Sequence, residues 1–418
     1  MTDVAKFTDA AAPSVAIAKA LEQQGKEFSD LIDDEGNQYV DLVMEGGGVL
    51  GIALTGYTYV LEQAGIRFLG VGGTSAGSIN ALMIAALDSP AMPKSEKLLT
   101  ALADMPMEKF IDGDSDARDF SNAMLEKVRM TKLLFKAMQV MDNLKEDLGL
   151  NPGDEFLKWL TAELEKVQIS TNAQLEERLS IKPQGLRKRD GGQLGEVDCR
   201  GTLAMVAADI TTETKVEFPK MAKLYWPDPS AVNPACFARA SMSIPLFFHP
   251  YKVECPQSAE IRQAWQDLAK YDGKLPESVY FIDGGIMSNF PINLFHTPYK
   301  VPDAPTFGAK IGVDRAEPVE ITSPAKLLGA VFDAARHTLD YDFIMQNPDY
   351  KHLVAMIDTG KHNWLNFSMP EADKIDLFQR GAAKAAEFLQ SFDWANYKKI
   401  RADLRDAFLK DRAALRVG

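Results

Sequence analysis

The sequence predicts an α/β protein with a mostly parallel central sheet. Two short apolar segments, residues 38–44 and 66–72, each end at or beside glycine. Each is followed by a helical pattern, at residues 52–64 and 78–87 respectively. Parallel strands must be joined by a crossover, so two successive strand–turn–helix units indicate a parallel sheet.

The segments before and after these units have a different composition. Residues 1–38 are polar and predict a helical lead-in, with one helix at about residues 14–24. Residues 90–181 are charged, rich in methionine and without strand signals. With the Gly- and Lys-containing loop that follows, they predict a helical insertion over about residues 90–200, which is a candidate lid.

Apolar segments return after the insertion. They predict strands at residues 202–209, 279–282, 309–313 and 353–357, and closing helices at residues 371–389 and 395–415. We therefore divide the chain into the lead-in (1–38), a main domain that contains the insertion (39–390) and a basic C-terminal helix (391–418).

The composition argues against several classes of protein. The 418 residues carry 46 Lys and Arg against 59 Asp and Glu, a net charge of −13, which disfavours nucleic-acid binding. Three cysteines without CxxC spacing indicate no disulfide framework, and no ligand cluster is visible, so we expect no metal and no cofactor. The N-terminus lacks the apolar segment of a secretory signal, and no apolar run reaches about 18 residues. We expect a cytoplasmic or peripheral membrane protein, with export lacking a cleavable signal left open.

Residues 73–77, Gly-Thr-Ser-Ala-Gly, have the spacing of a nucleophile elbow. A serine between a strand and a helix must occupy a tight turn, and Gly73 and Gly77 remove the β-carbons that would clash there. The turn places the Ser75 hydroxyl at a helix N-terminus, where the helix dipole favours developing negative charge.

A glycine loop, Gly46, Gly47 and Gly48, follows the first predicted strand. Successive backbone N–H groups of this kind build an oxyanion hole or a phosphate cradle. With Gly51 the loop also matches the dinucleotide pattern G-x-G-x-x-G, but the strand at residues 66–72 does not end in the acidic residue which that site needs. We favour an oxyanion loop beside Ser75.

A serine nucleophile needs a base. None of the five histidines lies in a motif (His249, His296, His337, His352 and His362). A conventional Ser-His-Asp hydrolase would take its histidine from late in the chain, which makes His296, His337 and His362 the candidates.

Asp283 is the stronger candidate for the base. It ends an apolar strand and is followed by Gly284 and Gly285, which allow close backbone approach. Burial at such a place raises the basicity of a carboxylate. Asp209 and Asp314 also follow strands, and we expect them to cap turns.

Together these motifs resemble the patatin-like phospholipase family. The segments that carry the resemblance are residues 46–51, 73–77, 207–211, 240–250, 283–291 and 365–381. The likeness extends over roughly residues 39–90, 200–315 and 350–390.

The resemblance implies a three-layer α/β/α fold and hydrolysis of phospholipid or lysophospholipid acyl esters by a Ser-Asp dyad. Carried over by position, Ser75 is the nucleophile, Asp283 is the base, and Gly46–Gly48 supply the oxyanion N–H groups. The elbow and its supports are Gly73, Gly77, Gly51, Gly284 and Gly285. Leu50 departs from the pattern, because many members carry Arg or Lys there, so a side-chain cation at this loop is in doubt.

Two basic amphipathic stretches are candidates for contact with a membrane or micellar substrate, namely residues 124–144 and 394–418. Packing of the first against the core, and a solvated closing helix for the second, are the simpler explanations. A requirement for a protein activator is left open.

Other functions compatible with the residues are a Ser-His-Asp esterase acting on small soluble esters, acyl transfer in place of hydrolysis, and a non-catalytic module that binds a phosphate-bearing ligand.

Overall fold

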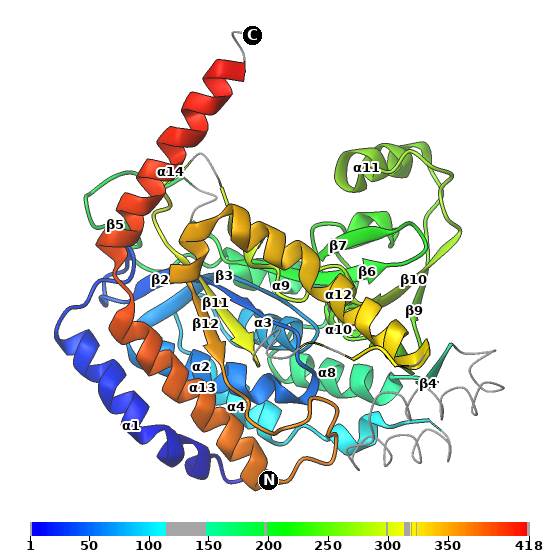
Figure 1. Cartoon of the computed structure of the whole chain (residues 1–418), viewed down its shortest axis with the longest axis horizontal. Coiled ribbons are helices and arrows are strands. Elements are labelled where there is room, and N and C mark those ends of the chain that lie inside the picture. Colours follow the sequence, from blue (N-terminus) through cyan, green and yellow to red (C-terminus); the bar gives the residue numbers. More distant parts are fainter. Residues whose placement is uncertain are drawn as a thin grey trace.

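The computed structural model of the protein describes residues 2–113, 148–195, 199–297, 300–312, 318, 320–322 and 324–415. Within these ranges, ten strands form one sheet (Figure 1). Its parallel neighbours, in spatial order, are β12 (Val354–Ile357), β11 (Thr306–Ile311), β2 (Gln38–Met44), β3 (Ile66–Thr74) and β6 (Thr202–Asp209). The mostly parallel central sheet predicted from the sequence is therefore confirmed.

The far side of the sheet is antiparallel. β6 pairs with β10 (Ser278–Asp283), and β10 pairs with β9 (Tyr251–Glu254). Three short strands extend the sheet, namely β1 (Leu31–Ile32), β5 (Arg187–Lys188) and β7 (Thr214–Phe218). β10 runs antiparallel to β6 but pairs only with the last three residues of β6, so its last residue, Asp283, lies level with the end of β3.

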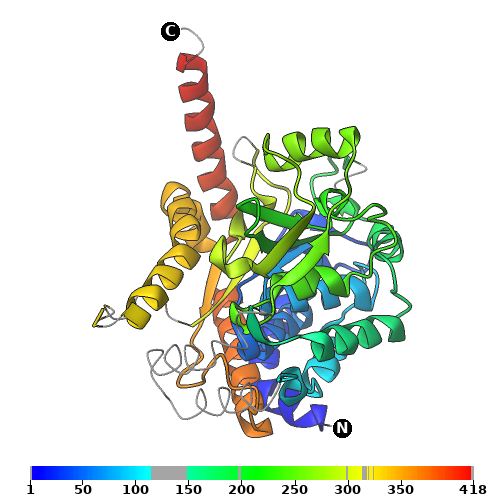
Figure 2. The ribbon, with the colours of Figure 1, turned by 90° about the vertical axis from the view of Figure 1, so that its right-hand side faces the viewer.

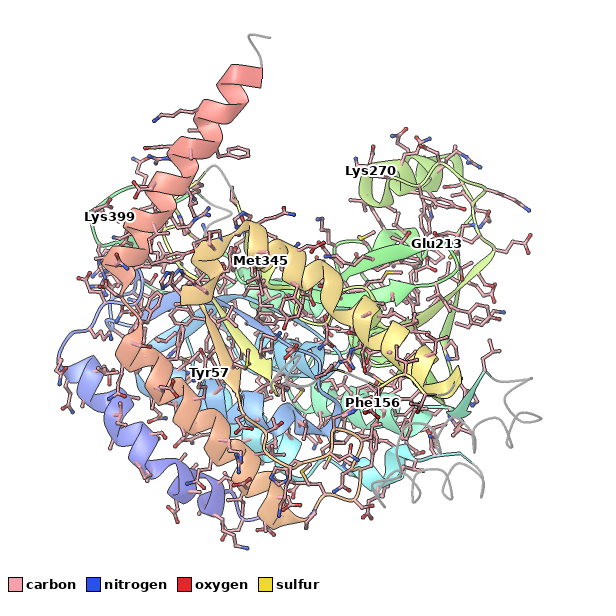
Figure 3. All side chains as sticks on the ribbon, in the orientation of Figure 1. Tyr57, Phe156, Glu213, Lys270, Met345 and Lys399 are labelled. Carbon is pink, nitrogen blue, oxygen red and sulfur yellow. The ribbon has the colours of Figure 1, made fainter. Side chains whose placement is uncertain are left out.

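The two predicted strand–helix units are present, with α2 (Ile52–Gln63) after β2 and α3 (Ala76–Leu87) after β3. The closing helix α13 (Glu371–Ser391) packs on α2 at unusually short range. A β-carbon on Gly381 would collide with the carbonyl oxygen of Ala53, and one on Gly56 with that of Phe378. Helix α1 (Val4–Gln23) covers α13, and the buried Tyr57 lies inside this layer (Figure 3).

Helix α12 (Pro324–Gln346) was not predicted. It connects the parallel neighbours β11 and β12, whose order along the sheet is the reverse of β2 and β3. Right-handed crossovers therefore put α12 on the opposite face from α2, and Figure 2 shows it on the side of the strands away from α2. Helices thus cover both faces of the sheet. α12 also packs on the 3-10 turn Gly284–Ile286 that follows Asp283.

The predicted insertion contains the helices α4 (Ser95–Ala103), α8 (Asp154–Lys166) and α9 (Asn172–Ser180). The expectation that it lacks strands is wrong, because β4 (Gly149–Asn151) pairs with β8 (Leu246–Phe248), and β5 lies in the segment predicted as a loop. Strands of two or three residues give no periodic signal, and their partners are distant in the sequence. The amphipathic stretch at residues 124–144 lies outside the described residues.

The remaining helices are α10 (Ala235–Ser241), α11 (Ala259–Ala269) and α14 (Trp394–Leu415). The helical character predicted for the C-terminal segment is confirmed, and α14 projects from the body of the molecule (Figures 1 and 2). Among the described helices, none has both the length and the apolar character needed to cross a bilayer.

Candidate active site

Ser75 occupies the turn between β3 and α3. Its backbone angles are φ 51° and ψ −118°, a left-handed conformation that only a surrounding structure can impose on serine. Its carbonyl accepts from the amide of Ile79 at 3.1 Å and from the hydroxyl of Ser78 at 2.7 Å, which anchors it to the first turn of α3. The side chain is thereby held at the N-terminus of the helix.

Strand register brings Asp283 to the same place. Thr74, at the end of β3, pairs with Val206, and Asp283, at the end of β10, pairs with the next residue, Ala207. Ser75 and Asp283 therefore flank β6 at one edge of the sheet, with exposed fractions of 4% and 7%. The Ser75 hydroxyl is close enough to the Asp283 carboxyl to lower its pKa.

The carboxyl of Asp283 lies in a buried environment. Burial raises the pKa of its carboxyl above the ordinary value. The guanidinium of Arg336, the hydroxyl of Ser75 and the amide of Gly285, which donates to Asp283 Oδ1 at 2.7 Å, each oppose that rise. A carboxylate held in this way is a stronger base than one in water, which is the property that a serine nucleophile requires.

The glycine loop lies against the serine. A β-carbon on Gly46 would be 3.2 Å from that of Ser75. The amide of Gly46 donates to the carbonyl of Asn289 and that of Val49 to the carbonyl of Trp364, both at 3.0 Å. Within the described part of the chain, the amides of Gly47 and Gly48 have no backbone acceptor, so both are able to donate to a bound anion.

The segment predicted by resemblance at residues 240–250 holds both Ser75 and Asp283 by their backbones. The hydroxyl of Ser241 accepts from the amide of Ser75 at 2.9 Å. The carbonyl of Ser243 accepts from the amide of Asp283 at 2.8 Å. The segment was noted in the sequence, but nothing in its spacing showed what these serines contact.

The supporting glycines allow backbones to approach closely. A β-carbon on Gly73 or Gly77 would meet the carbonyl of Met44, and one on Gly284 the carbonyl of Val206. Gly51 faces the side chain of Ala76, with a built β-carbon 3.2 Å away. Leu50 is apolar and buried in the core, and residues 46–51 contain no Lys or Arg, so the loop itself carries no cation.

Apolar side chains line a small cavity of about 40 Å³ beside Ser75. Its walls include Met105, Met107, Phe110, Phe156, Met242, Ile244, Phe248 and Phe367. Phe156 comes from α8, in the predicted insertion (Figure 3). The wall suits a hydrocarbon chain attached to Ser75, and methionine side chains adapt readily to different shapes.

The histidine candidates have other partners. His296 Nδ1 is 2.7 Å from the hydroxyl of Tyr350, and His362 Nε2 is 2.7 Å from Asp376 Oδ2. The backbone of His337 is in α12, and its side chain is outside the described residues. Asp209 accepts from the amide of Thr211 at 2.8 Å as the predicted turn cap, whereas Asp314 is not described.

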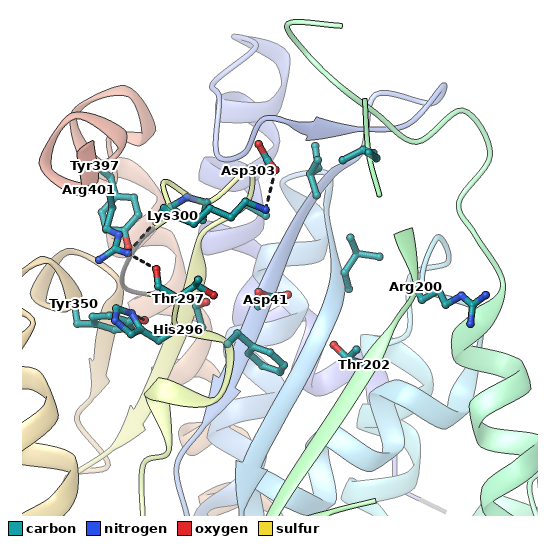
Figure 4. Close-up of a pocket in the computed structure, with 17 residues that line it drawn as sticks. Asp41, Arg200, Thr202, His296, Thr297, Lys300, Asp303, Tyr350, Tyr397 and Arg401 are labelled. Atoms are coloured by element: carbon teal, nitrogen blue, oxygen red, sulfur yellow. Dashed lines mark hydrogen bonds and ion pairs between the residues drawn. The ribbon is translucent and has the colours of Figure 1, made fainter. Parts of the chain in front are cut away.

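His296 lies at the opposite edge of the sheet, in a cavity of about 260 Å³ (Figure 4). Thr202 and Thr306, the first residues of β6 and β11, line it together with Asp41 of β2. Burial raises the pKa of Asp41 to about 6. The amino ends of the parallel strands thus form this cavity, away from Ser75.

Within the described ranges, no cluster of three or more His, Cys, Asp or Glu side chains is arranged to hold a metal ion. The geometry is instead that of a serine, a buried carboxylate and a glycine loop, which is suited to acyl transfer through a covalent intermediate.

Comparison with known proteins identifies relatives. The model of the family described as patatin-like phospholipase matches residues 42–296, more than half of the chain. The uncharacterized protein YqhO of Bacillus subtilis (strain 168) is 26% identical over 358 residues, covering 85% of this chain and the whole of that protein.

Two solved structures align with this chain at low TM-scores. VipD from Legionella pneumophila aligns with a TM-score of 0.34 and 13% identity over 87% of this chain and 70% of VipD. The ExoU–SpcU complex from the type III secretion system of Pseudomonas aeruginosa contains a chain that aligns with a TM-score of 0.34 and 15% identity. That alignment covers 85% of this chain and 52% of the other, so this chain spans about half its length. Since the family model covers most of the sheet and includes both Ser75 and Asp283, this chain belongs to the patatin-like phospholipases, a family of lipid acyl hydrolases.

Proposed function

We propose that the protein hydrolyses acyl esters of phospholipids or lysophospholipids with Ser75 as nucleophile and Asp283 as base. The convergence of Ser75, held in a strained turn, and the buried Asp283 on either side of β6 is the observation that carries the proposal. The apolar cavity beside Ser75 supports an acyl chain as the group transferred.

The reaction has two halves. Ser75 Oγ attacks the ester carbonyl carbon while Asp283 takes its proton, and the amides of Gly47 and Gly48 donate to the resulting oxyanion. The ester C–O bond then breaks, and Asp283 returns the proton to the leaving alcohol. Water attacks the acyl-enzyme, Asp283 takes the water proton, and the Ser75 oxygen leaves and is reprotonated as the fatty acid is released.

Peripheral contact with lipid through α14 is part of the proposal. Three of its cations are already engaged, Lys398 with Asp30 at 2.8 Å, Arg401 with Asp349 at 3.3 Å and Arg405 with Asp406 at 2.7 Å. Further along the helix, Phe408 and Leu409 are exposed, next to the cation of Lys410. An apolar pair beside a cation is suited to the interface of an anionic bilayer.

The test compares wild type with Ser75→Ala and Asp283→Asn on mixed phospholipid vesicles, with released fatty acid as the readout. Asp209→Asn is the matched control, because Asp209 is another buried carboxylate at a strand end. We expect fatty acid from the wild type and the control, and none from the other two variants when both are folded.

The same assay separates the alternatives. Each histidine is replaced by alanine, His337 included, and a silent histidine variant with an active Asp283→Asn would establish a Ser-His-Asp esterase. Formation of an acyl ester on an added alcohol, without fatty acid, would indicate acyl transfer. A folded wild type whose Ser75 does not react with a fluorophosphonate would indicate a binding module.

A further inference from the structure

Asn289 joins the glycine loop to the turn that follows Asp283. Its carbonyl accepts from the amide of Gly46 at 3.0 Å, and its Nδ2 donates back to the carbonyl of Gly46 at 3.2 Å. The same Nδ2 donates to Glu45 Oε1 at 3.1 Å. The side chain is 3% exposed. The position of the oxyanion loop relative to Asp283 therefore depends on how this one amide is held.

Arg336 of α12 holds that amide from the other side. Its Nη2 donates to Asn289 Oδ1 at 2.8 Å. Its guanidinium carbon lies 5.8 Å from the ring centre of Trp364, whose carbonyl accepts from the amide of Val49. Arg336 thus contacts Asn289, which accepts from the amide of Gly46 at the start of the glycine loop. It also contacts Trp364, which accepts from the amide of Val49 directly after the loop.

Arg336 is also beside Asp283. A β-carbon built on Gly285 would lie 2.8 Å from Asn289 Oδ1, 2.9 Å from Asp283 Oδ1 and 3.4 Å from Arg336 Nε. The amide of Asn289, the carboxylate of Asp283 and the guanidinium therefore converge on one point.

A second residue of α12 fixes the helix at this place. Asp340, one turn beyond Arg336, accepts from the hydroxyl of Ser288 at 2.6 Å and from the amide of Phe290 at 2.7 Å. Residues four apart lie on the same face of a helix. Arg336 and Asp340 therefore both hydrogen-bond to residues 288–290, and these bonds fix the position of Arg336 relative to Asn289.

We propose that Arg336 is a positioning residue of the Ser75–Asp283 site, which orients Asn289 and the oxyanion loop and supplies the positive charge that stabilises ionised Asp283. The proposal rests on the proposed function of Ser75 and Asp283. It assigns to α12, outside the range of the family match, a cation that the glycine loop lacks because Leu50 is apolar.

The charged groups around Asp283 determine the sign of the expected effect. Arg336 approaches from α12, while Asp340 and the buried Glu45–Lys310 pair, 3.6 Å apart, lie further along the same network. The guanidinium lowers the pKa of Asp283 against the rise caused by burial. Without it the pKa of Asp283 rises further, so the pH at which the base becomes ionised also rises.

The experiment measures kcat/KM against pH for a soluble p-nitrophenyl ester with wild type, Arg336→Gln and Arg336→Lys. Arg380→Gln is the matched control, because Arg380 pairs with Asp376 on α13 at 2.7 Å. For Arg336→Gln we expect the acid limb to move up by about one pH unit and activity at neutral pH to fall about tenfold or more. Arg336→Lys keeps the charge, so its acid limb should stay near that of wild type while kcat falls.

A folded Arg336→Gln with an unmoved acid limb would overturn the proposal, as would an equal shift in Arg380→Gln. If Arg336→Gln does not fold, the proposal is tested with Arg336→Lys and Asn289→Asp instead. The lysine variant must lose kcat, and the aspartate, which places a second carboxylate beside Asp283, must move the acid limb upward. A wild type that neither hydrolyses the ester nor labels at Ser75 would instead refute the proposed function itself.

Discussion

The amide of Ser75 donates to the hydroxyl oxygen of Ser241 at 2.9 Å, and that hydroxyl donates to the carbonyl of Val206 at 2.6 Å. Ser241 is fully buried. One side chain therefore ties the strained serine turn to strand β6, the strand that separates Ser75 from Asp283. The geometry of the site depends on this bridge as well as on the two reacting groups.

Replacing Ser241 by alanine should weaken both stability and activity. The buried amide of Ser75 would lose its acceptor, which costs about 1–3 kcal/mol of unfolding free energy. We expect kcat to fall by a similar factor with soluble and with vesicle substrates, because the change disturbs the turn that holds Ser75 and not the binding of substrate. Urea denaturation and steady-state kinetics measure the two effects. Ser180→Ala, which removes an exposed hydroxyl on α9, is the control, and equal losses in both variants would contradict the role of the bridge.

The raised pKa of Asp283 predicts the pH dependence of activity. The carboxyl must be ionised to accept the Ser75 proton, so kcat/KM should rise through an acid limb above the range of an ordinary carboxyl, about pH 4. The profile of kcat/KM for a soluble ester gives the limb directly. A limb at or below pH 4 would contradict the buried-base assignment.

The same burial predicts a stability effect of Asp283→Asn. A carboxyl whose folded-state pKa is raised stabilises the fold when protonated, and this contribution is lost as the pH rises through the folded-state pKa. The amide cannot ionise, so the variant should be at least as stable as wild type at pH 7 although it is inactive. Urea midpoints at pH 4 and pH 7 test this, and a variant less stable than wild type at pH 7 would be inconsistent with it.

Asp41 offers an independent test at the opposite edge of the sheet (Figure 4). Its pKa of about 6 exceeds that of an unfolded aspartate, so wild-type stability should fall from about pH 4 to pH 6 as the carboxyl ionises. Asp41→Asn removes that ionisation and keeps an acceptor for the amide of Gly70, which now donates to Asp41 at 2.8 Å. We expect a gain on the order of 2 kcal/mol at pH 7 that vanishes near pH 4, with activity unchanged.

Gly48 should not tolerate a side chain. Its φ is +55°, and a β-carbon there would collide with the carbonyl of Trp364. Gly48→Ala should therefore displace the oxyanion loop and lower kcat about a hundredfold or more. Gly25, with φ +67° and open space around it, is the control, because Gly25→Ala carries similar backbone strain far from Ser75. Loss of stability by both and loss of activity by Gly48→Ala alone is the expected pattern, and normal kcat in Gly48→Ala would contradict it.

The sequence was sufficient for features whose signal is local. Ser75 could be singled out because its strand, turn and helix are consecutive, and Asp283 because an apolar strand ends there before two glycines. Arg336 could not, since it lies 53 positions after Asp283 in a helix with no motif, and its contact with Asn289 exists only once α12 crosses the sheet. Likewise the β4–β8 pair joins segments about a hundred residues apart and has no local pattern.

The most direct test of the account is the rate at which a fluorophosphonate labels Ser75, followed by intact mass and peptide mapping. We expect one adduct per chain, located on Ser75 and absent in Ser75→Ala. In Asp283→Asn we expect labelling slowed about a hundredfold or more, because the hydroxyl has lost its base. Labelling of Ser75 at the wild-type rate in a folded Asp283→Asn, or an adduct on another residue, would contradict the assignment of Asp283 and Ser75 as the reacting pair.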